Sequence, residues 1–193
     1  MLSIYKKNMK QNINLGDEKK FVGYKEQGIT NCLDLCKKIL NNYGLKSYGS
    51  STAVFRLIYE KNGKLQYFGT DPQNNYKNAI KCIDRHLENN RPIIVGVNHT
   101  LNRGINEGTT DHFVVIYGRG YDNNTKSYYY QYYEVGKSNV ANGYDDELNR
   151  FYYIDSETPL FYDNESRRGD KVRFDVTQVR PNDGDISGTV SQK

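Results

Sequence analysis

A cysteine and a histidine stand at two positions from which they could act together in catalysis. His112 begins the apolar run 112–118, which ends in glycine and predicts a buried strand with an imidazole at its mouth. Cys32 follows the loop 27–31 at the start of a predicted helix. A helix N-terminus favours the thiolate, the nucleophilic form of the side chain. We therefore predict that Cys32 attacks a carbonyl carbon while His112 takes the thiol proton and later donates one to the leaving amine.

Two further positions complete the predicted site. Asp155 ends the aromatic strand predicted at 151–154, which we expect beside the histidine strand, so that its carboxylate would orient the imidazole. Gln27 stands five residues before Cys32, and its amide with the Cys32 backbone N–H would form an oxyanion hole. Asn31 is the alternative donor for that hole.

Other interpretations remain open at this stage. Taken singly, each site residue has an ordinary structural role, such as a small core side chain for the cysteine. His99 is an alternative base, although its loop offers no strand to hold the ring. Asp111 would point away from its neighbour His112 if the strand begins there. The loop 98–111 would then overhang the cleft and shape specificity.

A zinc site is the rival arrangement. Cys32 and Cys36 are four residues apart on one predicted helix, and Cys82 and His86 are four apart on the next. If the two helices faced each other, these side chains would form a Cys3His tetrahedral site. Core packing explains the same residues. Zinc would make Cys32 a ligand and remove the nucleophile.

Two predicted helices and a series of strands indicate the α+β class. The first helix is expected at 32–43 and the second at 72–89, with Asp71 as its cap. A hairpin is expected around Asn62-Gly63, with a helix over 51–59 as the competing interpretation. The remaining predicted strands are 92–97, 113–118, 127–135, 151–154 and 171–179.

Length and composition favour one globular domain. The chain has 193 residues, and we expect a polar arm at 1–20, the domain at 21–180 and a disordered tail at 181–193. The net charge is +4 without a block of like charges, so no nucleic-acid partner is expected. No apolar run is long enough to span a membrane. The tyrosine-rich run 128–133 is compatible with a stacking surface for sugars or bases, although a half-buried strand explains it better.

The three cysteines suggest reduced thiols rather than a disulfide framework. No signal peptide is visible at the N-terminus. We therefore expect synthesis in the cytoplasm, with export without a cleaved signal as the alternative.

Residues 24–160 resemble the papain-like cysteine peptidases, especially the bacteriocin-leader peptidases. The NlpC-type cell-wall amidases use the same pair of a catalytic cysteine and histidine. The resemblance lies in the order of the motifs: Gln27 before a helix-starting cysteine, Pro92 before an apolar strand, the histidine strand, and an aromatic strand ending at Asp155. The chain departs from the family in the spacing of Gln27 and in having Leu33 after the cysteine. The resemblance implies a cysteine-bearing helix packed on an antiparallel sheet that carries the histidine and the aspartate.

The function that follows from this resemblance is a cysteine peptidase or amidase that needs no cofactor. Its substrate would be a peptide or a peptidoglycan stem peptide. A toxin-like bacterial effector of this kind would have an inhibitory immunity protein as a partner. A hydrolase and an acyl transferase use the same residues. The alternatives from other classes are a non-catalytic papain-like binding module and the zinc-stabilised interaction domain.

Overall fold

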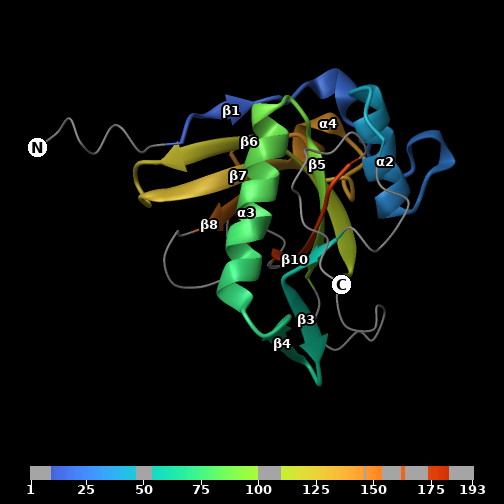
Figure 1. The fold of residues 1–193 in the computed structure, drawn as a ribbon. Helices are drawn as coiled ribbons and strands as arrows, with labels where there is room; N and C mark the ends of the chain where they lie inside the picture. Colours follow the sequence, from blue (N-terminus) through green and yellow to red (C-terminus); the bar gives the residue numbers. More distant parts are fainter. Residues whose placement is uncertain are drawn as a thin grey trace, which may run out of the picture.

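A curled antiparallel sheet with helices packed on it gives the protein its α+β fold (Figure 1). The computed structural model describes residues 10–46, 54–99, 110–145, 147–153, 162–163 and 174–182. The strands of the main sheet are β1 (Ile13–Asn14), β2 (Phe55–Arg56), β5 (Ile93–Asn98), β6 (His112–Asp122), β7 (Ser127–Tyr133), β8 (Arg150–Tyr153), β9 (Tyr162–Asp163) and β10 (Phe174–Arg180). The helices are α2 (Cys32–Asn42), α3 (Pro72–Glu88) and the short α4 (Val140–Gly143), with 3-10 turns at Glu18–Lys20 and Glu26–Gly28.

The strand order brings the sheet back on itself. Neighbouring strands follow the order β1-β6-β5-β10-β9-β8-β7, and β7 also pairs with β6. The strands from β5 to β10 therefore form a closed ring of pairings within the described part of the chain. β1 extends this ring from β6, and β2 pairs with β10. β6 pairs with β5 over residues 112–116 and with β7 over residues 115–122, so His112 at its start has a paired strand on the β5 side.

Alternating residues of β6 pack into two different cores. Val114 and Ile116 belong to the cluster that contains the buried face of α3, and Val115 and Tyr117 belong to the cluster around α2. Since successive strand residues point to opposite faces, the two helices cover opposite faces of the sheet. This double covering explains why β5 and β6 are almost continuously apolar instead of alternating between apolar and polar residues.

Helix α2 begins and ends as its sequence indicates. The Asn31 side chain caps it by accepting hydrogen bonds from the backbone N–H groups of Leu33 and Asp34. Gly44 follows the helix with a φ of 74°, the left-handed conformation that glycine adopts without strain. One face of the helix is completely buried, and it consists of Leu35, Cys36, Ile39 and Leu40. The predicted helix at 32–43 is therefore confirmed to within one residue.

The predicted second helix and hairpin also form. Asp71 caps α3 through the N–H of Asn74, and Pro72 is in its first turn. The strands β3 (Ile58–Lys61) and β4 (Lys64–Tyr67) pair around Asn62-Gly63, which both have a positive φ. This is the geometry of a type I′ turn. The competing helix over 51–59 is wrong for its described part, where β2 and the start of β3 lie.

The predicted N-terminal arm is part of the domain where it is described. β1 pairs with β6, and the N–H of Leu15 donates to the carbonyl of Tyr117. The hydroxyl of Tyr133 accepts a hydrogen bond from the N–H of Asp17 at 2.7 Å, and Tyr43 donates to the Leu15 carbonyl. These bonds attach the segment to the sheet and to the end of α2. Residues 1–9 lie outside the described residues.

The domain also continues into the first residues of the predicted tail. Asn182 is completely buried, and its side chain accepts hydrogen bonds from Arg91 and donates one to the Pro92 carbonyl. Residues 183–193 lie outside the described part of the chain.

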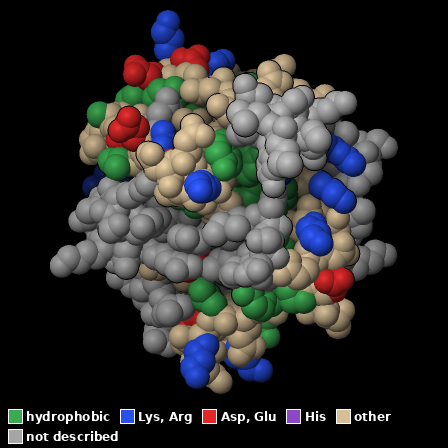
Figure 2. All heavy atoms as spheres, turned by 90° about the vertical axis from the view of Figure 1, so that its left-hand side faces the viewer, with side chains coloured by type: hydrophobic (Ala, Val, Ile, Leu, Met, Phe, Trp, Pro, Cys, Tyr) green, Lys and Arg blue, Asp and Glu red, His purple; other side chains and the backbone are tan. Residues whose placement is uncertain are grey.

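No helix in the described ranges is long and apolar enough to cross a membrane. On the face drawn in Figure 2, described basic and acidic side chains both reach the surface.

Candidate active site

Cys32 is the first residue of α2, immediately after the capping residue. Its side chain is only partly buried, whereas Cys36, one turn later, has no exposed surface. The backbone groups of Phe113 and Leu33 lie beside the sulfur and are among the groups that lower the pKa of the thiol. The helix N-terminus and the edge of β6 therefore meet at this thiol.

The structure brings His112 to Cys32, as the sequence predicts. His112 is the first residue of β6 and lies opposite Val97 of β5. On one side its imidazole faces the Cys32 thiol, which is among the groups that raise the pKa of the imidazole. On the other side, its Nε2 lies 2.7 Å from Oε1 of Glu134. Because Nε2 is taken by the carboxylate, Nδ1 is the nitrogen left for the sulfur.

Glu134 occupies the position from which a carboxylate could orient the imidazole, the position predicted for Asp155. Asp155 lies outside the described residues, so its prediction is untested, but the position on Nε2 belongs to Glu134. The Glu134 side chain is only 2% exposed. A buried carboxylate at hydrogen-bond distance fixes the tautomer of the imidazole and stabilises its protonated form.

The sequence held only part of the signal for Glu134. β6 and β7 form a hairpin in which Val115 lies opposite Tyr133. Glu134, the residue after β7, therefore falls beside Val114, on the same face of the sheet as His112 two residues away. Pairing the predicted strands through the turn alone would set Glu134 opposite Val115, and the register shift between Ile116 and Gly118 is what places it beside Val114.

Gly136 leaves room for the carboxylate. Its N–H donates to Oε1 of Glu134 at 2.7 Å. A Cβ at this glycine would lie 2.8 Å from the same oxygen and 3.5 Å from the His112 ring. Any larger residue would therefore push against the pair that orients the imidazole.

The charges at the site favour a thiolate and an imidazolium. Burial alone would raise the pKa of Cys32, but the hydrogen bond and charge of His112, with the two backbone N–H groups, bring it below its ordinary value. Burial alone would lower the pKa of His112, but the Glu134 carboxylate and Cys32 raise it to about 9. A proton near neutral pH is therefore better placed on the imidazole than on the sulfur.

The two predicted oxyanion donors have different outcomes. The structure places the backbone of Gln27 in the 3-10 turn Glu26–Gly28, just before α2, and its side chain lies outside the described residues. The side-chain oxygen of Asn31 is occupied in capping α2. The backbone N–H of Cys32 is at the helix start and has no partner within the helix, as expected for the first residues of a helix.

The residues of the rival zinc site are not brought together. Cys36 packs in the α2 cluster, while Cys82 belongs to the α3 cluster on the opposite face of the sheet. His86 contacts Cys82 within α3, with Nδ1 2.8 Å from the Cys82 carbonyl oxygen. Among the described residues, no three His, Cys, Asp or Glu side chains are grouped to hold a metal.

His99 lies beside His112. Its ring packs against His112 at 6.1 Å between centroids and against Phe174 at 5.5 Å. Its backbone N–H donates to the Asp111 carboxylate at 3.2 Å. His99 and Phe174 together form an aromatic wall against the imidazole of His112.

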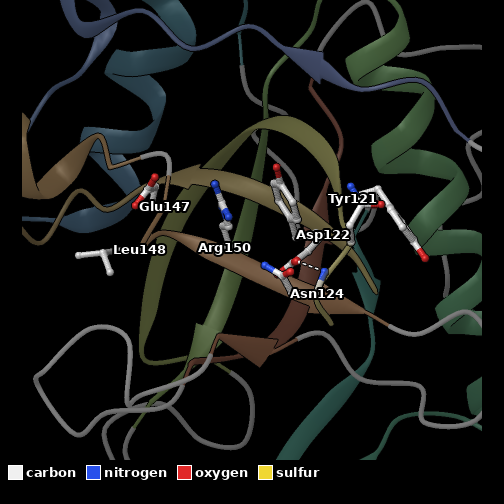
Figure 3. Close-up of a pocket in the computed structure, with 8 residues that line it drawn as sticks. Tyr121, Asp122, Asn124, Glu147, Leu148 and Arg150 are labelled. Carbon is white, nitrogen blue, oxygen red and sulfur yellow. Dashed lines mark hydrogen bonds between the residues drawn. The ribbon is translucent and has the colours of Figure 1, made fainter. Parts of the chain in front are cut away.

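The tyrosine-rich strand mainly supplies core. Tyr130, Tyr132 and Tyr133 have no exposed surface. Tyr129 differs, because it lines a hollow of about 630 Å³ at the far end of β6 and β7 (Figure 3). The Arg150 guanidinium lies 4.4 Å from the centre of the Tyr129 ring. Tyr121 lines the same hollow nine residues after His112, roughly 30 Å along an extended strand, so the hollow is separate from the cysteine site.

In comparisons with known proteins, the chain matches no protein-family model, no curated protein and no solved structure.

Proposed function

We propose that the protein is a cysteine hydrolase with a papain-like arrangement, acting as a peptidase or an amidase. The observation that carries the proposal is the series of Cys32, His112 and Glu134, in which the thiol and the imidazole shift each other's pKa and the imidazole is hydrogen-bonded to the carboxylate. In it a partly exposed thiol at a helix N-terminus faces an imidazole, and a buried carboxylate orients that imidazole. This is the arrangement that activates a cysteine as a nucleophile.

In the proposed first step, the Cys32 thiolate attacks the carbonyl carbon of an amide. The new C–S bond places negative charge on the carbonyl oxygen, which the backbone N–H of Cys32 stabilises. The C–N bond then breaks, and the imidazolium of His112 gives its proton to the leaving amine. The products of this step are a free amine and a thioester on Cys32.

In the second step, neutral His112 takes a proton from water, and the resulting hydroxide equivalent attacks the thioester. The C–S bond breaks, a carboxylic acid leaves, and the thiolate and imidazolium are restored. Glu134 keeps the ring oriented through both steps and remains ionised. An amine in place of water would make the same enzyme an acyl transferase.

The proposed substrate is a peptide amide, and a peptidoglycan stem peptide is the preferred case. This choice rests on the resemblance to leader peptidases and cell-wall amidases, which is a weaker argument than the geometry. A role as a bacterial effector with an immunity protein follows from the same resemblance.

Selective labelling of the thiol tests the proposal. An electrophilic thiol probe should label wild-type protein at Cys32, and peptide mapping should find the label there. Labelling should persist in Cys36→Ala, the matched control from the same helix, and disappear in Cys32→Ala. Release of peptides from purified peptidoglycan, read by mass spectrometry, should depend on Cys32 in the same way.

The main alternative is a binding module with the same fold. It would fold normally and bind peptides, but its Cys32 would react no faster than an unperturbed thiol. Unselective or absent labelling in a folded sample would therefore end the catalytic proposal.

A further inference from the structure

Arg180 lies on the same side of the sheet as the nucleophile. It is the last residue of β10 and lies opposite Ile94 of β5. Ile94 and its β6 neighbour Val115 both belong to the α2 cluster. Arg180 therefore projects from the face that α2 covers, but from the strand beyond the two that α2 lies against.

Phe113 connects Arg180 to the catalytic cysteine. The guanidinium carbon of Arg180 is 5.6 Å from the centre of the Phe113 ring. The same phenylalanine and Cys32 both pack against the α2 cluster, and the Phe113 backbone is among the groups that lower the pKa of the Cys32 thiol. A single residue thus lies between the nucleophile and a cation, and a substrate extending from Cys32 across Phe113 would reach that cation.

The Arg180 guanidinium is available to bind an anion. Arg180 is partly buried, and none of the described carboxylates forms an ion pair with it. Burial lowers the pKa of the Arg180 guanidinium, and no described carboxylate raises it again. The buried Arg119 shows the contrast, since it is held by Asp84 at 2.7 Å and by Glu88. A partly desolvated guanidinium binds a carboxylate more strongly than a fully solvated one does.

We propose that Arg180 is a specificity-determining residue that binds a carboxylate of the substrate close to the amide that Cys32 attacks. The substrate class would be a peptide with an acidic side chain or a free terminal carboxylate near the cleaved bond. This inference rests on the proposed function, because it assigns the substrate of the same site.

Two alkylating reagents of nearly equal size test the inference without knowledge of the substrate. In both iodoacetate and iodoacetamide, the thiolate forms a C–S bond and iodide leaves. Only iodoacetate carries a carboxylate. The rate ratio of iodoacetate to iodoacetamide at Cys32 should fall roughly fivefold in Arg180→Gln, the size expected for one nearby charge pair. The iodoacetamide rate should stay the same.

Two further variants serve as controls. Arg180→Lys keeps the positive charge and should keep part of the preference for iodoacetate. Arg150→Gln removes a cation at the distant hollow and should leave the ratio unchanged. An unchanged ratio in a folded Arg180→Gln protein would overturn the inference while leaving the nucleophile intact. If Cys32 of the folded wild-type protein did not react with iodoacetamide, the proposed function itself would be overturned.

Substrate cleavage provides the second measurement. Matched peptides that differ only in a carboxylate or a carboxamide near the cleaved bond should differ in kcat/KM by about tenfold or more. Arg180→Gln should remove that difference by slowing the acidic peptide. Equal use of both peptides by wild-type enzyme would contradict the role of Arg180 and would still confirm hydrolysis.

Discussion

The two helices that cover the sheet each carry a cysteine with a histidine close by, and the two pairs differ in almost every other respect. Cys82 and His86 lie within α3, and their Sγ and Nδ1 are 3.7 Å apart. Both are buried in the core. Cys32 is at the first position of α2, partly exposed, and its histidine comes from a strand.

The difference shows that distance between a thiol and an imidazole does not by itself make a nucleophile. The α3 pair lies in the core, where Cys82 is only 3% exposed and Nδ1 of His86 lies 2.8 Å from the Cys82 carbonyl oxygen. The α2 pair has a helix N-terminus, two backbone N–H donors and the buried Glu134. Each of these features favours charge separation between sulfur and ring.

Removing a member of each pair should give the largest contrast. His112→Ala should lower kcat/KM by about 10²- to 10⁴-fold, because the proton transfers lose their acid and base. His86→Ala should affect stability and leave kcat/KM of the folded fraction unchanged. Steady-state kinetics with circular dichroism on both variants make the measurement. A large kinetic loss in folded His86→Ala would remove the distinction between the pairs.

Truncating a buried side chain should destabilise the protein by a similar amount in either helix. Ile39→Ala in α2 and Ile83→Ala in α3 each remove a completely buried side chain, and each should cost about 2–5 kcal/mol of unfolding free energy. Urea denaturation measures both. Only Ile39→Ala should also slow thiol labelling, because α2 positions Cys32. Equal labelling in the two variants would show that α2 does not need its packing to present the thiol.

Replacing Glu134 tests the contribution of the carboxylate apart from that of the thiol and the imidazole. The pKa of His112 is about 9 in the folded protein, so the imidazolium persists below that pH and is lost as the pH rises through it. In Glu134→Gln this loss should occur about 1–3 pH units lower. On the alkaline side, kcat/KM of Glu134→Gln should therefore begin to fall at a lower pH than kcat/KM of the wild-type protein. The same profile in both proteins would mean that Glu134 does not set this pKa.

The helix caps should give the smallest effects. Asn31→Ala and Asp71→Ala remove the caps of α2 and α3, and each should cost about 1 kcal/mol of stability. Thermal unfolding measures both. Asn31→Ala should in addition reduce the reactivity of Cys32 near neutral pH, since it loosens the helix N-terminus under the thiol. If Asp71→Ala lowered the reactivity of Cys32 more than Asn31→Ala does, the role of the α2 cap at the thiol would be contradicted.

The sequence predicts the local parts of this site and not the long-range ones. Cys32 is found because capping, apolar spacing and a terminal glycine define α2 within a few residues. His112 is found because it begins an apolar strand. Glu134 can be placed only from the register of the β6–β7 hairpin, including its shift between Ile116 and Gly118, which no local pattern reveals.

The N-terminal segment was missed for a similar reason. β1 has two residues, Ile13 and Asn14, too few for an alternating pattern to be visible. Its structure comes from pairing with β6 and from the hydroxyls of Tyr43 and Tyr133. Such tertiary hydrogen bonds leave no periodicity in the sequence that a local reading could detect.

The pH dependence of iodoacetamide alkylation at Cys32 tests the proposed ion pair most directly. The rate at each thiol, followed by peptide mapping, should reach half its maximum at a lower pH in wild-type protein than in His112→Ala. Cys36 and Cys82 should remain unmodified while the protein is folded. Identical profiles for Cys32 in the two proteins, or equal reaction at all three cysteines, would contradict a thiolate activated by His112.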